Sequence, residues 1–373
     1  MVYFRSMLIF EVSEIIFFTS LVTATLFLVT RTFPILLKGK QKKQQIFPPL
    51  SVVIAAHNEE LNLERNLPEI ISQDYPDYEI IIVLDRCSDN SKNIVERYAD
   101  EYSFIRFMEI NHIPEGYNPK KFALTQAINH SNTNWIVLTD ADCDPGEGWL
   151  RSIGCLVDDE TDFILGYGPY VRSKSLLNHF IRYETFMTGS DYLSSAMINF
   201  PYMGVGRNLI YRKSVFIENG YGEFRKITGG DDDLFVQYNA TGKRTKSMIG
   251  RNTLTFSQPE SSIVSYLKQK RRHYSVGKYY KDGSKLKHSV KYFFQTLLWI
   301  SFIILAFEST SPIHVYWSFF GFYIVKGMLD WGVGEKLGSG YSYLFGPFLD
   351  LFYTVFVPVV VLVATASKKI TWK

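Results

Sequence analysis

The sequence has little cysteine and little excess charge of either sign. Its three cysteines, Cys87, Cys143 and Cys155, form no CxxC pair. This argues against a disulfide scaffold or a zinc knuckle and favours a reducing compartment. The 40 lysines and arginines nearly balance 37 aspartates and glutamates, which leaves a net charge of +3. Because nucleic-acid-binding proteins usually carry a large basic excess, we expect no nucleic-acid partner.

Apolar residues, in contrast, are abundant and unevenly distributed. Hydrophobic residues make up 46% of the 373 positions and charged residues 21%, which excludes intrinsic disorder. This length suits one large domain or two ordinary ones. The aromatic fraction is 16%, and much of it lies in the C-terminal third.

The N-terminal segment is predicted to be a membrane anchor, residues 1–33. Residues 7–30 are mostly apolar, and about 20 such residues cross a bilayer as a helix. A cleaved signal peptide is the alternative, but Arg5 alone is a weak basic start and no small-x-small cleavage site follows. Basic residues after the run predict that this end is cytoplasmic. They are Arg31, Lys38, Lys40, Lys42 and Lys43.

The C-terminal region, residues 289–367, is predicted to be transmembrane as well. Its apolar and aromatic runs cover residues 292–307, 312–328 and 343–366, with buried core helices as the alternative. Four crossings in total would leave the basic tail, residues 368–373, outside the cell, against the positive-inside tendency. The number of crossings therefore stays open, with an interfacial or re-entrant segment as the alternative to a fourth span.

The middle of the chain, residues 48–256, alternates apolar strands with amphipathic helices. Such alternation predicts an α/β fold with a mostly parallel sheet and helices on both faces. Strands are expected at 50–56, 78–85, 104–110 and 134–138, and helices at 59–72, 90–101 and 120–130. In open parallel sheets the ligand crevice lies at the carboxyl ends of the strands. Polar groups follow three of these ends: His57-Asn58-Glu59, Asp85-Arg86 and Asp140-Ala141-Asp142.

The segment TDADCDP delivers three carboxylates, Asp140, Asp142 and Asp144, directly after an apolar strand. Carboxylate oxygens are the ligands preferred by Mg²⁺ and Mn²⁺, often together with substrate phosphates. On extended chain, two aspartates separated by one residue point the same way. The motif therefore predicts a divalent metal and diphosphate site, with a solvated acidic turn as the alternative.

A second acidic cluster, GGDDDLF, places Asp231, Asp232 and Asp233 after Gly229-Gly230. Two glycines allow a tight turn that presents carboxylates into a cleft. A carboxylate beside an acceptor hydroxyl acts as a general base. The alternative is a helix N-terminus, where the macrodipole favours acidic residues.

Basic residues gather in residues 257–288, which are predicted to form an amphipathic interfacial segment. Its sequence QKRRHYSVGKYYKDG intersperses cations with aromatics. Arginine binds a diphosphate through two parallel hydrogen bonds, and a basic helix also lies on an anionic membrane surface. Lys120 and Lys121, at the start of KKFALTQAI, are further phosphate candidates, with a solvated helix start as the alternative.

Six of these motifs occur together in one order. AAHNEE, VLDRCSDNS, KKFAL, TDADCDP, GGDDDLF and QKRRH follow one another between residues 48 and 280. In this order they resemble a membrane-bound family 2 glycosyltransferase with a GT-A fold. The resemblance implies a Rossmann-like catalytic domain flanked by transmembrane helices, and a nucleotide-diphosphate sugar as donor.

The resemblance also implies a donor site. Ala55, His57 and Glu59, together with Asp85, would line the pocket for the base and ribose. Lys120 would approach the nucleotide. Asp140 and Asp142 would be the D-x-D pair that holds Mg²⁺ or Mn²⁺, with Asp142 as the direct ligand.

For the acceptor side, the resemblance implies a catalytic aspartate at Asp231, or at Asp232 if the alignment shifts by one residue. Gln269, Arg272 and His273 match the Q-x-x-R-W motif that caps the diphosphate and acceptor in processive members. His273 replaces the usual tryptophan, which weakens the case for processivity. Arg86 and Gly230 stand where acidic residues are common.

The implied reaction is transfer with inversion at the anomeric carbon, in a single displacement. The acceptor would be a lipid, a lipid-linked saccharide or a polysaccharide. The catalytic domain would lie on the cytoplasmic side of a bacterial inner membrane, in contact with membrane lipids. A catalytically silent subunit with the same fold is the alternative function. A transporter is disfavoured because few ionisable residues interrupt the apolar runs.

Overall fold

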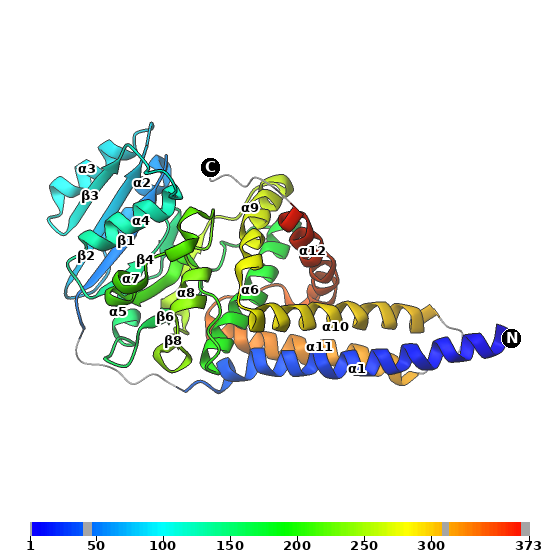
Figure 1. Ribbon diagram of the computed structural model, residues 1–373. Helices are drawn as coiled ribbons and strands as arrows, with labels where there is room; N and C mark the ends of the chain where they lie inside the picture. Colours follow the sequence, from blue (N-terminus) through cyan, green and yellow to red (C-terminus); the bar gives the residue numbers. More distant parts are fainter. Residues whose placement is uncertain (1, 40–46, 308–312, 367–373) are drawn as a thin grey trace.

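The computed structural model describes residues 2–39, 47–307 and 313–366, with side chains from Phe10 onward. An α/β domain lies at one end of the molecule and long helices extend from it at the other (Figure 1). The main sheet has seven strands in the order β3-β2-β1-β4-β7-β6-β8. They are β1 Leu50–Ala56, β2 Tyr78–Asp85, β3 Ile105–Ile110, β4 Trp135–Leu138, β6 Phe163–Leu165, β7 Leu209–Arg212 and β8 Thr245–Ser247.

The predicted mostly parallel sheet is confirmed. β1 pairs in parallel with β2 and β4, β2 with β3, and β6 with β8. The sequence did not indicate that β7 runs antiparallel to its neighbours β4 and β6. A separate two-stranded sheet joins β5 Cys143–Pro145 to β9 Thr255–Ser257, and so anchors the TDADCDP segment.

Helices cover both faces of the sheet, as expected. Along β1, Val52 and Ile54 belong to one buried cluster and Val53 belongs to the other, as the two-residue period of a strand requires. The first cluster includes residues of α2 Glu60–Ile71 and α3 Ser91–Glu101. The second includes residues of α4 Pro119–His130 and α6 Leu176–Met197.

The remaining helices are short or belong to the membrane region. The short ones are α5 Trp149–Gly154, α7 Lys213–Asn219, α8 Asp233–Asn239 and the 3₁₀ turns η1 Gly206–Asn208, η2 Gly222–Lys226, η3 Gly242–Arg244, η4 Arg251–Thr253, η5 Val276–Tyr279 and η6 Tyr343–Phe345. The longer ones are α1 Val2–Leu37, α9 Ile263–Ser275, α10 Asp282–Phe307, α11 Ile313–Leu337 and α12 Gly346–Ala366.

Three segments among the described residues are long and apolar enough to cross a membrane: Phe10–Leu37, Asp282–Phe307 and Tyr343–Ala366. The predicted run at 312–328 forms most of α11, which does not meet that standard; it carries Lys326 and Asp330. Even so, Figure 1 shows α1, α10 and α11 side by side, whereas α12 lies across their axis next to α9.

Arg31 is one of the basic residues from which a cytoplasmic end was predicted, and the structure buries its side chain. Its side chain is buried in α1, where it forms an ion pair with Asp330 of α11 and donates to Ser190 Oγ of α6 at 3.0 Å. A buried charge needs such partners to offset its lost hydration. Lys40, Lys42, Lys43 and the basic tail lie outside the described residues.

The helix α9, which carries the QKRRH motif, is fixed to α6 by a buried ion pair. Lys270 donates to Glu184, and Tyr274 donates to the other oxygen of the same carboxylate at 3.1 Å. Lys270 and Glu184 are both less than a tenth exposed. The structure thus gives Lys270 a packing role, although the sequence presented it as one of several phosphate or membrane-surface cations.

We expect Lys270→Ala to lower the free energy of unfolding by about 3 kcal/mol, because it leaves the Glu184 carboxylate buried with a weaker partner. Thermal unfolding in detergent measures this. Lys268→Ala, two residues earlier on the exposed face of α9, is the matched control and should unfold at the wild-type temperature. Equal effects of the two variants would contradict the structural role of Lys270.

Candidate active site

The loops after β1 and β2 are held together in an unusual backbone conformation. Asn58 and Arg86 both have left-handed φ angles, 56° and 48°, which non-glycine residues adopt only when their surroundings hold them there. Asn58 Oδ1 accepts a hydrogen bond from Ser88 N at 2.7 Å, and His57 Nδ1 donates to the carbonyl of Asp85 at 2.5 Å. The two predicted polar strand ends are therefore joined to each other at one edge of the sheet.

Asp85 does not present a free carboxylate to this edge. The Arg86 guanidinium binds both of its oxygens, at 2.8 and 3.1 Å. Ala55 lies within β1 and is partly buried, while Glu59 accepts from Asn62 Nδ2 at 2.6 Å. The charge of Glu59 is one of the influences that raise the pKa of Asp142, so the two carboxylates are close enough to repel each other.

The TDADCDP segment turns at Ala141 and Asp142 before β5 begins, so the expected extended conformation of its D-x-D pair is wrong. β4 ends at Leu138 and β5 begins at Cys143, with Ala141 and Asp142 in the turn between them. The turn still gathers ligand atoms, because those of Asp140, Asp142 and Cys143 all lie within 4.8 Å of one another. Burial, followed by the charge of Asp140, raises the pKa of Asp142. A bound cation would relieve this repulsion.

The chemistry of the donor set fits a hard divalent cation through its two carboxylates. The sequence gave no reason to include Cys143 in this group. Its thiol is buried and contacts Ser257 Oγ at 3.1 Å, and burial raises its pKa well above the ordinary value. A protonated thiol is a poor ligand for Mg²⁺ or Mn²⁺. The carboxylates of Asp140 and Asp142 are therefore the residues that would hold the metal.

Lys120 joins the two acidic clusters. Its ammonium group lies 2.9 Å from Asp140 Oδ1 and 2.9 Å from Asp231 Oδ2, and its side chain is only 12% exposed. Burial works against its charge, but the carboxylates of Asp140 and Asp231 outweigh burial and raise its pKa. Lys120 therefore stays charged at the centre of the site.

The neighbouring Lys121 has a different environment from the one that a phosphate ligand would need. Its side chain is buried, and Nζ donates to the carbonyl of Phe224 at 2.7 Å. It therefore supports the loop before the GGDDD motif. Because this side chain is buried, the alternative of a solvated helix start is wrong for Lys121.

The GGDDD motif makes the tight turn that the sequence predicted. Gly229 and Gly230 have φ angles of 82° and 75°, in the region that favours glycine. A Cβ on Gly230 would approach Leu234 Cδ1 to 2.6 Å. The turn leads into α8, and Asp232 caps it by accepting from Asp233 N at 2.7 Å. The tight turn and the helix N-terminus that the sequence predicted as alternatives are thus both present, and the catalytic role stays a prediction.

The three consecutive aspartates differ sharply in their electrostatics. Burial opposes ionisation of Asp231, but Lys120 and Lys121 lower its pKa below the ordinary value. Burial and the charge of Asp231 raise the pKa of Asp232 to about 6. For Asp233, burial and the charge of Asp232 raise the pKa to about 8. Asp231 is therefore the most readily ionised of the three.

The end of α9 approaches this centre. The surrounding protein lowers the pKa of His273 well below its ordinary value, although the residue keeps contact with solvent. Nearby positive charges lower it further; they belong to Lys270, Arg272, Arg207 and Lys120. The imidazole is therefore neutral. Gln269 Oε1 is buried without a hydrogen-bond partner among the described residues. The charge of Lys120 thus acts on His273 of the QKRRH motif, while the role of Gln269 and Arg272 stays a prediction.

Arg207 is a site residue that the sequence did not reveal. It follows Gly206, the residue whose N–H donates to Asp232 Oδ2 at 2.7 Å. Its guanidinium lies 4.5 Å from the centre of the Tyr170 ring. Its positive charge partly offsets the increase in the pKa of Asp142 that burial and Asp140 cause. A partly buried cation whose charge acts on the D-x-D pair is suited to an anionic ligand. The flanking sequence, MGVGRNLIY, gave no signal beyond a lone arginine among glycines.

The chain is similar in sequence to known glycosyltransferases. Residues 51–220 match the model of glycosyl transferase family 2. A probable glycosyltransferase of Bacillus subtilis, YdaM, is 26% identical over 290 residues, which cover 72% of this chain and 67% of that protein. The poly-beta-1,6-N-acetyl-D-glucosamine synthase of Staphylococcus epidermidis is 29% identical over 116 residues, 31% of this chain and 27% of that protein.

Among solved structures, the mannosyltransferase PcManGT of Pyrobaculum calidifontis, in complex with GDP-Man and Mn²⁺, has a similar fold. The TM-score is 0.57 with 15% sequence identity, and the match covers 96% of this chain and 99% of that one. The likeness thus includes the helices outside the α/β domain. Residues 51–220 form a family 2 glycosyltransferase domain, and the chain is a glycosyltransferase with a GT-A fold.

Proposed function

We propose that this glycosyltransferase moves a sugar from a nucleotide-diphosphate sugar to a lipid, a lipid-linked saccharide or a polysaccharide, with inversion at the anomeric carbon. One observation carries this proposal. Lys120 contacts both Asp140 of the D-x-D turn and Asp231 of the GGDDD turn. The group that would hold a donor diphosphate and the group that would deprotonate an acceptor therefore share one centre.

In the proposed reaction, the acceptor oxygen attacks the anomeric carbon as the bond to the diphosphate breaks. Asp231 takes the hydroxyl proton, and the nucleoside diphosphate leaves with the electron pair. Lys120 and Arg207 are placed to stabilise the charge that develops on the leaving group. A divalent cation held by Asp140 and Asp142 would supply further neutralisation of the diphosphate.

Asp231 suits the role of base better than Asp232. Asp232 uses both oxygens as acceptors for backbone N–H groups, from Gly206 and Asp233, each at 2.7 Å. Burial and the charge of Asp232 raise the pKa of Asp233, and both its oxygens are acceptors, from Leu234 N at 2.7 Å and from the Tyr280 hydroxyl at 2.6 Å. Asp231 is ionised and faces Lys120, and a donor diphosphate would compete for that lysine and free the carboxylate.

The nucleotide is proposed to bind along the ends of β1 and β2, against Ala55, His57, Glu59 and Asp85. The Arg86–Asp85 pair would have to open, or Arg86 itself would contact the nucleotide. Gln269, Arg272 and His273 are proposed to close the site over the diphosphate and acceptor. The neutral imidazole of His273 is suited to a hydrogen bond with the donor or acceptor.

We further propose that the domain lies on the cytoplasmic side of a bacterial inner membrane, where soluble nucleotide sugars would reach it. The apolar helices α1 and α10 support a membrane position. The Staphylococcus epidermidis relative is named as a polysaccharide synthase, which supports an acceptor of this kind. The proposed boundaries remain 1–33 for the anchor, 48–256 for the domain and 257–288 for the interfacial segment.

The experiment that tests this function is nucleotide-diphosphate release by the purified protein in lipid, across UDP-, GDP- and dTDP-sugars. We expect release from one donor with Mn²⁺ or Mg²⁺ and a membrane lipid extract as acceptor. EDTA should reduce it at least a hundredfold, because the carboxylates alone would repel the diphosphate. Release from no donor would instead favour the catalytically silent subunit.

A further inference from the structure

The carboxyl end of β2 presents a guanidinium to solvent and keeps its carboxylate buried. Only 4% of the Asp85 side chain is exposed, whereas 42% of the Arg86 side chain is exposed. Both oxygens of Asp85 accept hydrogen bonds from Arg86. A guanidinium has donors and no acceptor. A ligand that reaches this end of the sheet therefore meets hydrogen-bond donors.

The hydrogen bonds of Arg86 leave one edge of its guanidinium free. Nε donates to Asp85 Oδ1 at 2.8 Å, and Nη2 donates to Asp85 Oδ2 at 3.1 Å. These two bonds use the edge that Nε shares with Nη2. The edge between Nη1 and Nη2 has no partner among the described residues. It carries two parallel N–H groups, which suit a ligand with two adjacent acceptors.

The backbone holds this free edge in a defined position. Arg86 has a left-handed φ angle of 48°, and its N–H donates to the carbonyl of Ile110, at the end of β3, at 2.9 Å. The preceding carbonyl, of Asp85, accepts from His57. Residues held in such a conformation cluster at ligand sites. The Arg86 side chain is thus fixed at its base by the backbone and at one edge by Asp85.

The order of the strands separates Arg86 from the proposed metal site. Asp140 and Asp142 follow β4, whereas Arg86 follows β2, and β1 lies between these two strands. All three strands run parallel. Because neighbouring strands lie about 4.8 Å apart, the ends of β4 and β2 are about 10 Å apart. A nucleotide with its diphosphate at β4 and its ribose over β1 would therefore place its base, and no phosphate, at Arg86.

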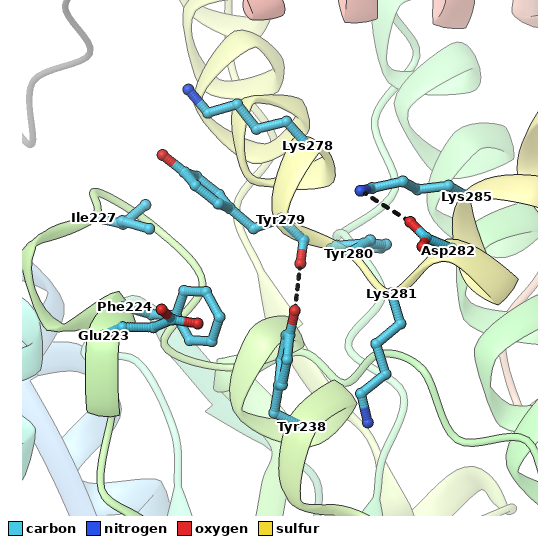
Figure 2. A pocket seen from close by; sticks show the side chains of 10 residues that line it. All are labelled: Glu223, Phe224, Ile227, Tyr238, Lys278, Tyr279, Tyr280, Lys281, Asp282 and Lys285. Carbon is cyan, nitrogen blue, oxygen red and sulfur yellow. Dashed lines mark hydrogen bonds and ion pairs between the residues drawn. The ribbon is translucent and has the colours of Figure 1, made fainter.

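The lysines of the pocket at the start of α10 do not offer a comparable pair of donors. This pocket, of about 590 Å³, is lined by residues of η2, α8, η5 and α10. Figure 2 shows Lys278 and Lys281 on opposite sides of the hydrogen bond that Tyr238 donates to the Tyr279 carbonyl at 3.0 Å. Cations that diverge in this way cannot hold one group together. The free N–H groups of Arg86, in contrast, belong to one planar group and point the same way.

We propose that Arg86 selects guanine as the base of the donor, through N7 and O6 of the purine. This rests on the proposed transfer from a nucleotide-diphosphate sugar and narrows the nucleotide to guanosine diphosphate. Guanine presents these two acceptors side by side, and arginine binds them through two hydrogen bonds. Adenine has an amino donor next to N7, which would face the donors of the guanidinium. Uracil has an N–H between its two carbonyls, so it offers no adjacent pair of acceptors.

Equilibrium binding of nucleoside diphosphates to the full chain in lipid, with Mn²⁺ and without turnover, tests the proposal. We expect GDP to bind at least about tenfold more tightly than UDP, CDP or ADP. Inosine diphosphate keeps N7 and O6 and should bind as GDP does. The analogue 7-deaza-GDP lacks the N7 acceptor and should bind about tenfold more weakly than GDP.

The Arg86→Lys variant keeps a cation beside Asp85 but loses the planar pair of donors. We expect it to lose about tenfold of its GDP affinity and to keep its UDP affinity, which also shows that it is folded. Arg97→Lys is the matched control, because Arg97 is an exposed arginine of α3 that pairs with Glu64. It should bind GDP as the wild type does.

The other outcomes overturn the proposal in different ways. If UDP, CDP or ADP binds the wild type as tightly as GDP, or if 7-deaza-GDP keeps full affinity, Arg86 does not read guanine. If Arg86→Lys weakens GDP and UDP by the same factor, Arg86 binds a phosphate. An unchanged GDP affinity in this variant excludes any contact of Arg86 with the base. If the wild type binds none of these nucleotides, the donor proposal fails too, so the two failures stay distinguishable.

Discussion

The Asp142→Asn variant is expected to lose nucleotide release about a thousandfold or more while keeping its fold. Asparagine has nearly the same shape as aspartate but lacks the charge that a divalent cation needs. Burial and the neighbouring Asp140 already raise the pKa of Asp142, so the wild-type charge is costly to the folded state. Its removal should leave the unfolding temperature unchanged or higher.

The measurement pairs turnover with Mn²⁺ binding in the purified, lipid-reconstituted protein. Asp144→Asn is the matched control, because Asp144 lies in the same TDADCDP segment but is exposed and outside the metal-binding group. We expect that control to retain turnover and Mn²⁺ affinity. Full activity of a folded Asp142→Asn protein would contradict its proposed role as a metal ligand.

The Asp231→Asn variant is expected to lower turnover by about 10²- to 10⁴-fold with nearly unchanged nucleotide affinity. Asparagine cannot accept the proton of the acceptor hydroxyl. Lys120 keeps Asp140 as a partner, so the centre should retain most of its donor-binding charge. Equilibrium nucleotide binding and single-turnover transfer, measured on the same preparation, separate these two effects.

Asp232→Asn provides the comparison. Its amide oxygen still accepts one backbone N–H, but its amide nitrogen cannot replace the second acceptor, so we expect a lower unfolding temperature. A different pattern would reassign the base. If Asp231→Asn loses nucleotide affinity, and Asp232→Asn loses turnover alone, then Asp231 binds the donor and Asp232 is the base.

Much of the α/β domain could be predicted because its signals are local. The apolar runs that become β1, β2 and β4 each end directly in polar residues, and the order of the chain places those ends on one edge of the sheet. The left-handed turn at Gly229-Gly230 was likewise readable from the two glycines. In the D-x-D segment, the residues were predicted correctly but their extended conformation was not, because pairing of β5 with β9 bends the chain.

In the membrane region, amino-acid composition predicted the apolar helices but not how they are arranged. The runs in α10 and α12 have similar lengths and hydropathy, yet Figure 1 shows α12 across the axis that α1 and α10 share. Arg31 appeared to mark the end of an anchor, but a partner in α11 allows it to be buried. Helix direction and buried charge pairs depend on contacts between distant segments, which a hydrophobic run does not encode.

By itself, the sequence determined the strand–helix alternation, the polar strand ends, the acidic motifs and the apolar N- and C-terminal segments. Only the tertiary structure brought Lys120 between Asp140 and Asp231, and placed Arg207 beside the D-x-D turn. It also distinguished Asp231, Asp232 and Asp233, three identical residues in a row. Their pKa values differ because burial and neighbouring charges act through space, and those neighbours lie far away along the chain.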